Sequence, residues 1–180
     1  RSEFHRVNVE GTRRLVRASV RAGVARVVYT SSVATVQPQP GEAATESSWA
    51  RVQDAPGHYK RSKILAEQEV LRLVREEAAP VVVVNPSAPV GLRDIKPTPT
   101  GQMVLDFLRG RMPAFVDTGL NVVDVDDVGR GHVLAARRGR VGERYILGGE
   151  NLSLYEILVL LGEIAGRKPP RYEIPHAVSI

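Results

Sequence analysis

Cysteine is absent from the 180-residue chain, which excludes disulfide scaffolds, thiolate metal sites, iron–sulfur clusters and cysteine nucleophiles. Aromatic residues make up only 5%, and no stripe of alternating basic and aromatic residues is present to stack nucleic-acid bases. Apolar runs such as 81–84 and 157–161 are short, so we expect no membrane-spanning segment. No signal-peptide pattern stands at the N-terminus, and a cytoplasmic location is the expectation.

The charge is basic but dispersed. The net charge is +5, from 21 arginines and 4 lysines interleaved with 20 acidic residues. With 43% hydrophobic and 25% charged residues, the composition is that of a soluble globular protein. We therefore interpret the arginines as a solvated surface and expect no nucleic-acid partner.

Helical periodicity alternates with short apolar runs along the chain. The pattern predicts helices over residues 7–22, 58–77, 100–110, 126–138 and 153–165, and strands over 27–30, 81–84, 114–116, 121–123 and 144–147. Residues 37–57 and 85–99 are predicted to be loops because proline and glycine recur in them. This alternation indicates an α/β fold with a parallel sheet.

The residues most indicative of chemistry are Ser32, Tyr59 and Lys63. Tyr59 and Lys63 lie one turn apart on the predicted 58–77 helix, so they share a face. A positive charge beside a tyrosine lowers the pKa of the phenol from about 10, which suits proton exchange near neutral pH. Ser32 follows the buried 27–30 strand, at the sheet edge where α/β proteins bind ligands. The alternative is that Tyr59 and Lys63 are ordinary surface residues, because such a pair arises by chance with a probability of about 0.1.

Other residues suggest competing chemistry. Asp124, Asp126 and Asp127 could suggest a divalent cation, but we favour a helix-capping role for Asp126 or Asp127. The four histidines are isolated from one another, so we expect no metal site. A serine hydrolase is disfavoured because no Gly-x-Ser-x-Gly elbow is present.

Five motifs together resemble those of the extended short-chain dehydrogenases/reductases, the NAD-dependent epimerase/dehydratase family. They are Asn8-Val9-Glu10-Gly11-Thr12, Val28-Tyr29-Thr30-Ser31-Ser32, Tyr59-x-x-x-Lys63, Asn85-Pro86 with Val90-Gly91, and Val123-Asp124-Val125-Asp126-Asp127-Val128. The stretches 85–91, 94–101, 115–124 and 142–153 narrow the resemblance to the hopanoid-associated sugar epimerases.

The resemblance implies a Rossmann-like, doubly wound parallel sheet with part of a smaller substrate-binding lobe. Residues 1–98 would be the catalytic part of the dinucleotide-binding domain, and 99–180 a mixed segment contributing to the sheet and to the substrate lobe. It also implies a role for each site residue. Catalysis would fall to Ser32, Tyr59 and Lys63, cofactor binding to Asn8, Thr30, Ser31, Tyr59, Lys63, Val84, Pro86 and Ser87, and substrate binding to Ser32, Asn85 and Arg93.

Two of these roles have simple alternatives. Asn8 could be an ordinary polar residue at a helix start. Arg93 and Lys96 could meet a substrate phosphate or remain solvated loop charges.

The implied reaction is hydride transfer between a sugar or sugar-nucleotide carbinol and NAD or NADP, with NAD preferred and Tyr59 as the acid/base. An NADP-dependent carbonyl reductase of the dihydroflavonol-reductase type would use the same three residues. A non-catalytic, nucleotide-binding member of the fold is a third hypothesis. The resemblance also suggests a homodimer formed through the helices over 7–22 and 58–77.

One departure from the family pattern concerns the phosphates. The Gly-x-x-Gly-x-x-Gly turn that holds the pyrophosphate is not in the sequence. We therefore expect a fragment truncated at both ends, lacking the N-terminal βαβ unit, that binds dinucleotide weakly and is inactive alone.

Overall fold

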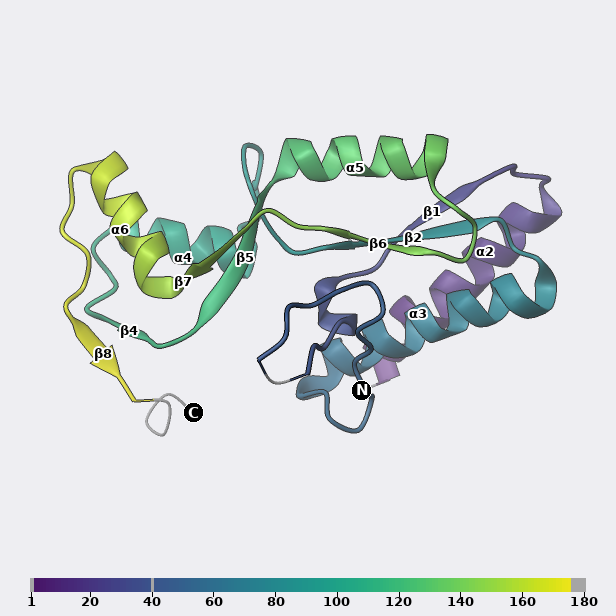
Figure 1. Cartoon of the computed structure of the whole chain (residues 1–180), viewed down its shortest axis with the longest axis horizontal. Helices are drawn as coiled ribbons and strands as arrows, with labels where there is room; N and C mark the ends of the chain where they lie inside the picture. The colour runs from purple at the N-terminus through teal and green to yellow at the C-terminus, as the bar shows by residue number, and fades with distance from the viewer. Residues whose placement is uncertain (1, 40, 176–180) are drawn as a thin grey trace. The chain divides into compact units, whose positions relative to one another are not determined.

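The computed structural model describes residues 2–39 and 41–175 (Figure 1). They form two compact units, which we describe separately. The first contains the chain up to Pro86 together with Gly129–Leu147. The second contains Ser87–Val128 and residues 148–175.

The first unit is built on a three-stranded sheet. Its strands are β1 (Val27–Thr30), β2 (Val81–Pro86) and β6 (Arg144–Leu147), in the order β1-β2-β6. Both pairings are parallel. The predicted α/β fold with a parallel sheet is thus confirmed.

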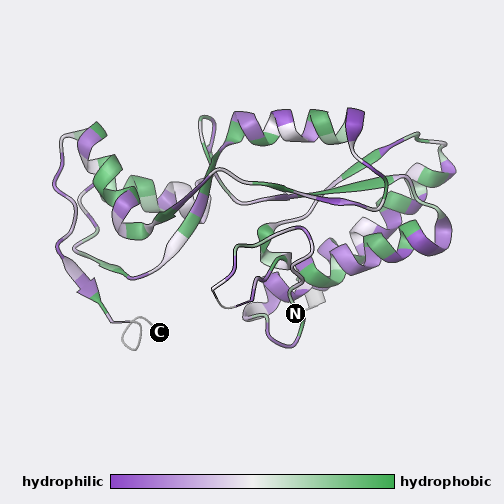
Figure 2. Cartoon of the chain, in the orientation of Figure 1, coloured by the Kyte–Doolittle hydropathy of each residue, from purple (hydrophilic) through white to green (hydrophobic). Residues whose placement is uncertain are grey.

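Helices cover both faces of this sheet. The helix at the N-terminus comprises α1 (Ser2–Phe4), the π-helical η1 (His5–Gly11) and α2 (Thr12–Arg21), and it packs with α3 (Gly57–Glu77). In Figure 1 these helices lie on one side of the sheet and α5 (Val125–Arg138) on the other. Because both faces are covered, the first four residues of β2, Val81–Val84, are all apolar with no polar alternation, and β2 is coloured as hydrophobic over this part in Figure 2.

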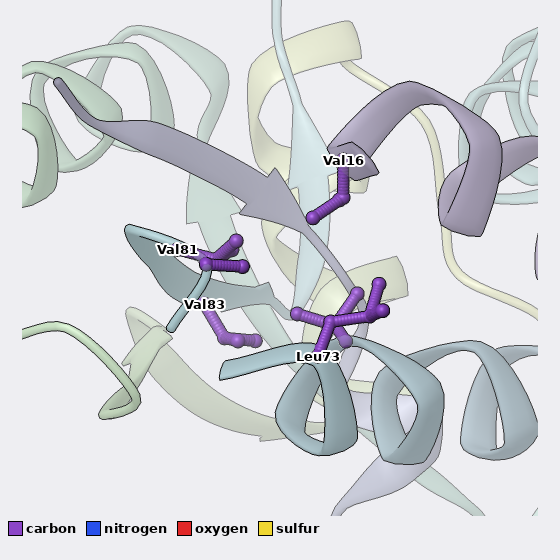
Figure 3. Packing of buried hydrophobic residues seen from close by; sticks show 6 residues of the cluster. Val16, Leu73, Val81 and Val83 are labelled. Atoms are coloured by element: carbon purple, nitrogen blue, oxygen red, sulfur yellow. The ribbon is translucent and has the colours of Figure 1, made fainter. Parts of the chain in front are cut away.

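Alternate residues of β2 face the two helical layers. Val81 and Val83 pack with Leu73 and other residues of α2 and α3, as Figure 3 shows. Val82 and Val84 pack on the opposite face, beside α5. All four valines are fully buried, so β2 lies at the centre of the core of this unit.

The second unit combines short strands with two helices. The strands β3 (Ala88–Val90), β5 (Gly119–Asp124) and β7 (Glu150–Ser153) form one sheet, in which β5 and β7 are antiparallel. A parallel pair joins β4 (Ala114–Val116) to β8 (Tyr172–Ile174). The helices are α4 (Pro99–Leu108) and α6 (Leu154–Ala165), and Ser153 with Glu156 forms a capping box at the start of α6.

Several predicted boundaries were wrong. The supposed loop over 85–99 contains the end of β2 and all of β3, because backbone pairing overrides the prolines there. The helix predicted from residue 100 begins at Pro99 and is capped by Thr98, whose hydroxyl accepts the Gly101 amide. The carboxylate of Asp124, one residue before α5, accepts the amide of Asp126, so the cap is neither Asp126 nor Asp127. The strands β7 and β8 were not predicted.

Candidate active site

Helix α3 carries Tyr59 and Lys63 toward the carboxyl end of β1. The Lys63 ammonium donates a hydrogen bond to the Thr30 carbonyl at 3.1 Å and lies 5.5 Å from the centre of the Tyr29 ring. Burial lowers the pKa of Lys63, and the nearby charge of Glu67 opposes part of that shift. A positive charge is therefore held next to the strand end that leads into Ser32.

Tyr59 lies in the first turn of α3 and is half exposed, at 50%. Its ring meets that of Phe4 edge-on, with 6.2 Å between the ring centres. The other tyrosine of this region, Tyr29, is unsuited to proton exchange, because burial raises its pKa to about 12. Of the two phenols, only Tyr59 is open to a ligand.

Ser32 begins a short 3-10 turn, η2 (Val33–Thr35), immediately after β1. Its backbone is extended and its hydroxyl accepts the Ala34 amide at 3.1 Å. Its carbonyl accepts hydrogen bonds from the Thr35 hydroxyl at 2.8 Å and from the Asn85 amide at 3.2 Å. The turn is therefore held by the side chains of Thr35 and Asn85 as well as by its own backbone hydrogen bonds.

Asn8 contacts the same helix from the π-helical segment. Its Nδ2 donates to the Ser62 hydroxyl at 2.9 Å, and that hydroxyl donates to the Tyr59 carbonyl at 2.7 Å. π-Helical turns are rare and recur at functional sites. Through its hydrogen bond to Ser62, Asn8 supports the turn of α3 that carries Tyr59.

The predicted cofactor-binding residues of the first unit lie at the carboxyl ends of β1 and β2. The Ser31 amide donates to the Val84 carbonyl at 2.8 Å, and Pro86 ends β2. The Ser31 hydroxyl is buried and has no hydrogen-bond partner among the described residues. The Thr30 hydroxyl lies 2.9 Å from Nε2 of His132.

The remaining predicted residues divide between the units. Asn85 is fully buried in the first unit; its Nδ2 donates to internal acceptors, while its Oδ1 finds no hydrogen-bond partner in the described structure. Ser87 and Arg93 belong to the second unit. Arg93 is exposed in the loop after β3 and has a positive φ of 71°.

Sequence reasoning missed three polar residues beside the site: Thr35, Glu67 and Arg144. They are buried and bonded to one another. A signal was available for Glu67, because it continues the spacing of Tyr59 and Lys63 along one helix face. No comparable pattern marks Arg144, whose contacts come from residues about a hundred positions away.

Within residues 2–39 and 41–175, no cluster of histidine, aspartate or glutamate side chains could hold a metal ion. Over the same residues, none of the helices has the length and apolar character needed to cross a bilayer.

Comparison with known proteins decides the family. Residues 1–148 match the model of the NAD dependent epimerase/dehydratase family. The chain belongs to this family. A family member from Synechocystis sp., named "Putative dihydroflavonol 4-reductase", is 48% identical over 97% of this chain and 52% of its own length.

Solved structures agree with the assignment to the NAD dependent epimerase/dehydratase family. The crystal structure of gox2253 is 51% identical and superposes with a TM-score of 0.94 over 98% of this chain and 54% of its own. PA4631, a nucleoside-diphosphate-sugar epimerase from Pseudomonas aeruginosa, is 28% identical with a TM-score of 0.90, over 98% of this chain and 58% of its own. The chain thus spans about half the length of the relatives it matches.

Proposed function

We propose that the protein carrying this chain is an NAD(P)-dependent oxidoreductase that transfers a hydride at a carbinol or carbonyl carbon, with Tyr59 as the acid/base. The observation that carries the proposal is the position of Lys63. Its ammonium bonds the carbonyl of Thr30, two residues before Ser32, and it stands one turn after the exposed Tyr59. Three groups that can act on one substrate oxygen are therefore supplied by one helix face and one strand end.

The polar groups at this sheet edge fit the nicotinamide half of a dinucleotide. The Ser31 hydroxyl and the Asn85 Oδ1 are buried without partners, and the Lys63 ammonium can bond ribose hydroxyls. When bound, the nicotinamide accepts or gives the hydride. Thr30, Val84, Pro86 and Ser87 are proposed to line the same half, with NAD the expected cofactor. A phosphate-binding glycine turn is not part of this sequence, so these residues would not hold the pyrophosphate.

Each catalytic side chain has a distinct task in this proposal. The Tyr59 hydroxyl gives a proton to a carbonyl oxygen, and in the reverse direction the Tyr59 phenolate takes one from a carbinol. The Lys63 charge stabilises the resulting phenolate. The Ser32 hydroxyl already accepts the Ala34 amide, which leaves its own proton for a hydrogen bond to the substrate oxygen.

Two substrate classes are supported by different observations. A sugar or sugar-nucleotide is implied by the motifs shared with the hopanoid-associated sugar epimerases, with Asn85 and Arg93 as proposed contacts. A carbonyl compound that is reduced at the expense of the cofactor is favoured by the name of the Synechocystis relative, which is 48% identical, whereas the sugar epimerase is 28% identical. An epimerase regenerates its cofactor, whereas a reductase consumes it.

The test uses the protein at its natural length with NADH and NADPH and three probes: a dihydroflavonol, cinnamoyl-CoA and UDP-galactose. Stoichiometric loss of reduced-cofactor absorbance identifies a reductase. Conversion of UDP-galactose into its C4 epimer without net cofactor loss identifies an epimerase. Either activity should fall by roughly 100-fold or more in Tyr59→Phe, the size expected for losing an acid/base group. Unchanged turnover in that variant would remove Tyr59 from the mechanism.

A further inference from the structure

A buried polar network joins the turn formed by Ser32 and η2, here called the Ser32 turn, to helix α3, which carries Tyr59 and Lys63. Its members are Thr35, Glu67, Asn85 and Arg144, all between 0% and 5% exposed. Two of them are ionised groups, which are costly to bury and are seldom placed in a core without a reason. Burial lowers the pKa of Arg144, while the charge of Glu67 acts in the opposite direction.

Glu67 is the centre of this network. Its Oε1 lies 2.7 Å from Nε of Arg144. Its Oε2 accepts a hydrogen bond from Nδ2 of Asn85 at 2.8 Å and lies 2.9 Å from the Thr35 hydroxyl, whose single proton it shares with the Ser32 carbonyl. One carboxylate on α3 therefore binds the end of η2, the end of β2 and the start of β6.

The two groups that contact Glu67 Oε2, the Thr35 hydroxyl and Asn85 Nδ2, also contact the backbone of Ser32. The Thr35 hydroxyl and Asn85 Nδ2 both reach the carbonyl of Ser32, at 2.8 and 3.2 Å. Glu67 is thus linked to the Ser32 backbone through one intervening side chain, either Thr35 or Asn85. Lys63, one turn earlier on α3, bonds the Thr30 carbonyl on the other side of that serine.

Arg144 extends the same network to the segment between Ser32 and Tyr59. Its guanidinium donates to the carbonyls of Glu46 at 2.9 Å and Ser48 at 3.3 Å, and it lies 3.8 Å from the centre of the Trp49 ring. The arginine therefore neutralises Glu67 and holds the long loop that precedes α3.

We propose that Glu67 is a positioning residue: its carboxylate oxygens set the place of Ser32 relative to Tyr59 and Lys63, and Arg144 pairs with that carboxylate and orients it. The inference rests on the proposed hydride-transfer function. Its physical basis is that catalytic groups must be held to a fraction of an ångström, and a serine in a short turn after a strand needs support from neighbouring side chains.

The experiment compares two double variants that both lack the ion pair. Glu67→Gln/Arg144→Met keeps an oxygen that can accept from Thr35 and Asn85, whereas Glu67→Leu/Arg144→Met does not. Hydrogen exchange of the full-length protein should be at least about tenfold faster at the amides of residues 34–36 in the leucine variant, with residues 82–84 unchanged. Equal exchange in the two variants would overturn the inference.

Turnover of the best of the three probes gives the second measurement. We expect kcat to be at least about tenfold lower in the leucine variant than in the glutamine variant, with KM within roughly twofold, because the loss is one of alignment. Equal kcat, even with faster exchange, would reduce Glu67 to a structural role and refute the proposal.

Two further comparisons keep the outcome decisive. If the leucine variant does not fold, Thr35→Val against Thr35→Ser makes the same test, since only serine keeps the hydroxyl that joins Ser32 to Glu67. Tyr59→Phe separates the two proposals: if it retains full turnover, the proposed function fails, and the exchange data alone then decide whether Glu67 holds the Ser32 turn.

Discussion

The buried ion pair allows a stability prediction of defined size. Replacing Arg144 by methionine keeps a long apolar side chain but removes the charge that faces Glu67 at 2.7 Å. Glu67 is 1% exposed, so water cannot replace the lost partner. Breaking a buried pair in this way costs about 3–5 kcal/mol.

The cost should be measured by urea unfolding and by thermal melting. For a domain of this size, each kcal/mol lowers Tm by about 2–4 °C, so Arg144→Met should lower it by roughly 6–20 °C. Replacing Glu67 by leucine in the same protein removes the unpaired charge as well. The double variant should therefore recover much of the lost stability, since an apolar pair of similar volume can replace a buried ion pair.

The control is the exposed pair formed by Arg17 of α2 and Glu77 of α3, whose side chains are 42% and 32% exposed. Arg17→Met should leave the unfolding midpoint nearly unchanged, because water solvates the remaining carboxylate. The reasoning fails if Arg144→Met is as mild as Arg17→Met, or if the double variant is less stable than both single variants.

Other predictions concern the core, Lys63, which is proposed to be catalytic, and a helix cap. Leu73→Ala should cost about 2–5 kcal/mol in urea unfolding, because Leu73 is fully buried between α3 and β2; a loss below about 1 kcal/mol would contradict the packing. Burial lowers the pKa of Lys63 in the folded protein below the value of 10.5 expected in the unfolded chain, so the unfolded chain binds this proton more tightly. The free energy of unfolding should therefore rise with pH between the lowered pKa and 10.5. Lys63→Met should abolish that rise while leaving neutral-pH stability equal or higher. Ser153→Ala should cost about 1 kcal/mol through the cap of α6. Bonds from Ser153 lower the pKa of Glu156, so this cap contributes above pH 4.5 and weakens as the pH falls through the lowered pKa; equal losses at neutral and acid pH would be inconsistent with it.

The parallel sheet could be predicted because its signal is local. The run Val81-Val82-Val83-Val84 is apolar at every position, which only a strand covered on both faces requires, and the structure places helices on both faces. The helix carrying Tyr59 and Lys63 was predicted to within one residue at its start, since its periodicity extends over many turns.

The missed features depend on contacts between distant residues. Asn85-Pro86 looked like the start of a loop, yet pairing with β6 extends β2 through both residues. The network around Glu67 needs Arg144, and the sequence gives no reason to bring an arginine from β6 to that helix. Similarly, β7 and β8 are short and become strands only because β5 and β4 lie alongside them.

The most direct test of the central claim is the turnover of Tyr59→Phe against wild type, in the full-length protein with saturating cofactor. Phenylalanine preserves the ring that meets Phe4 and removes only the hydroxyl. If Tyr59 is the acid/base, kcat should fall by about 100-fold or more while the protein folds normally and binds cofactor with similar affinity. A kcat within about twofold of wild type would contradict the account, since proton transfer would then pass through another group.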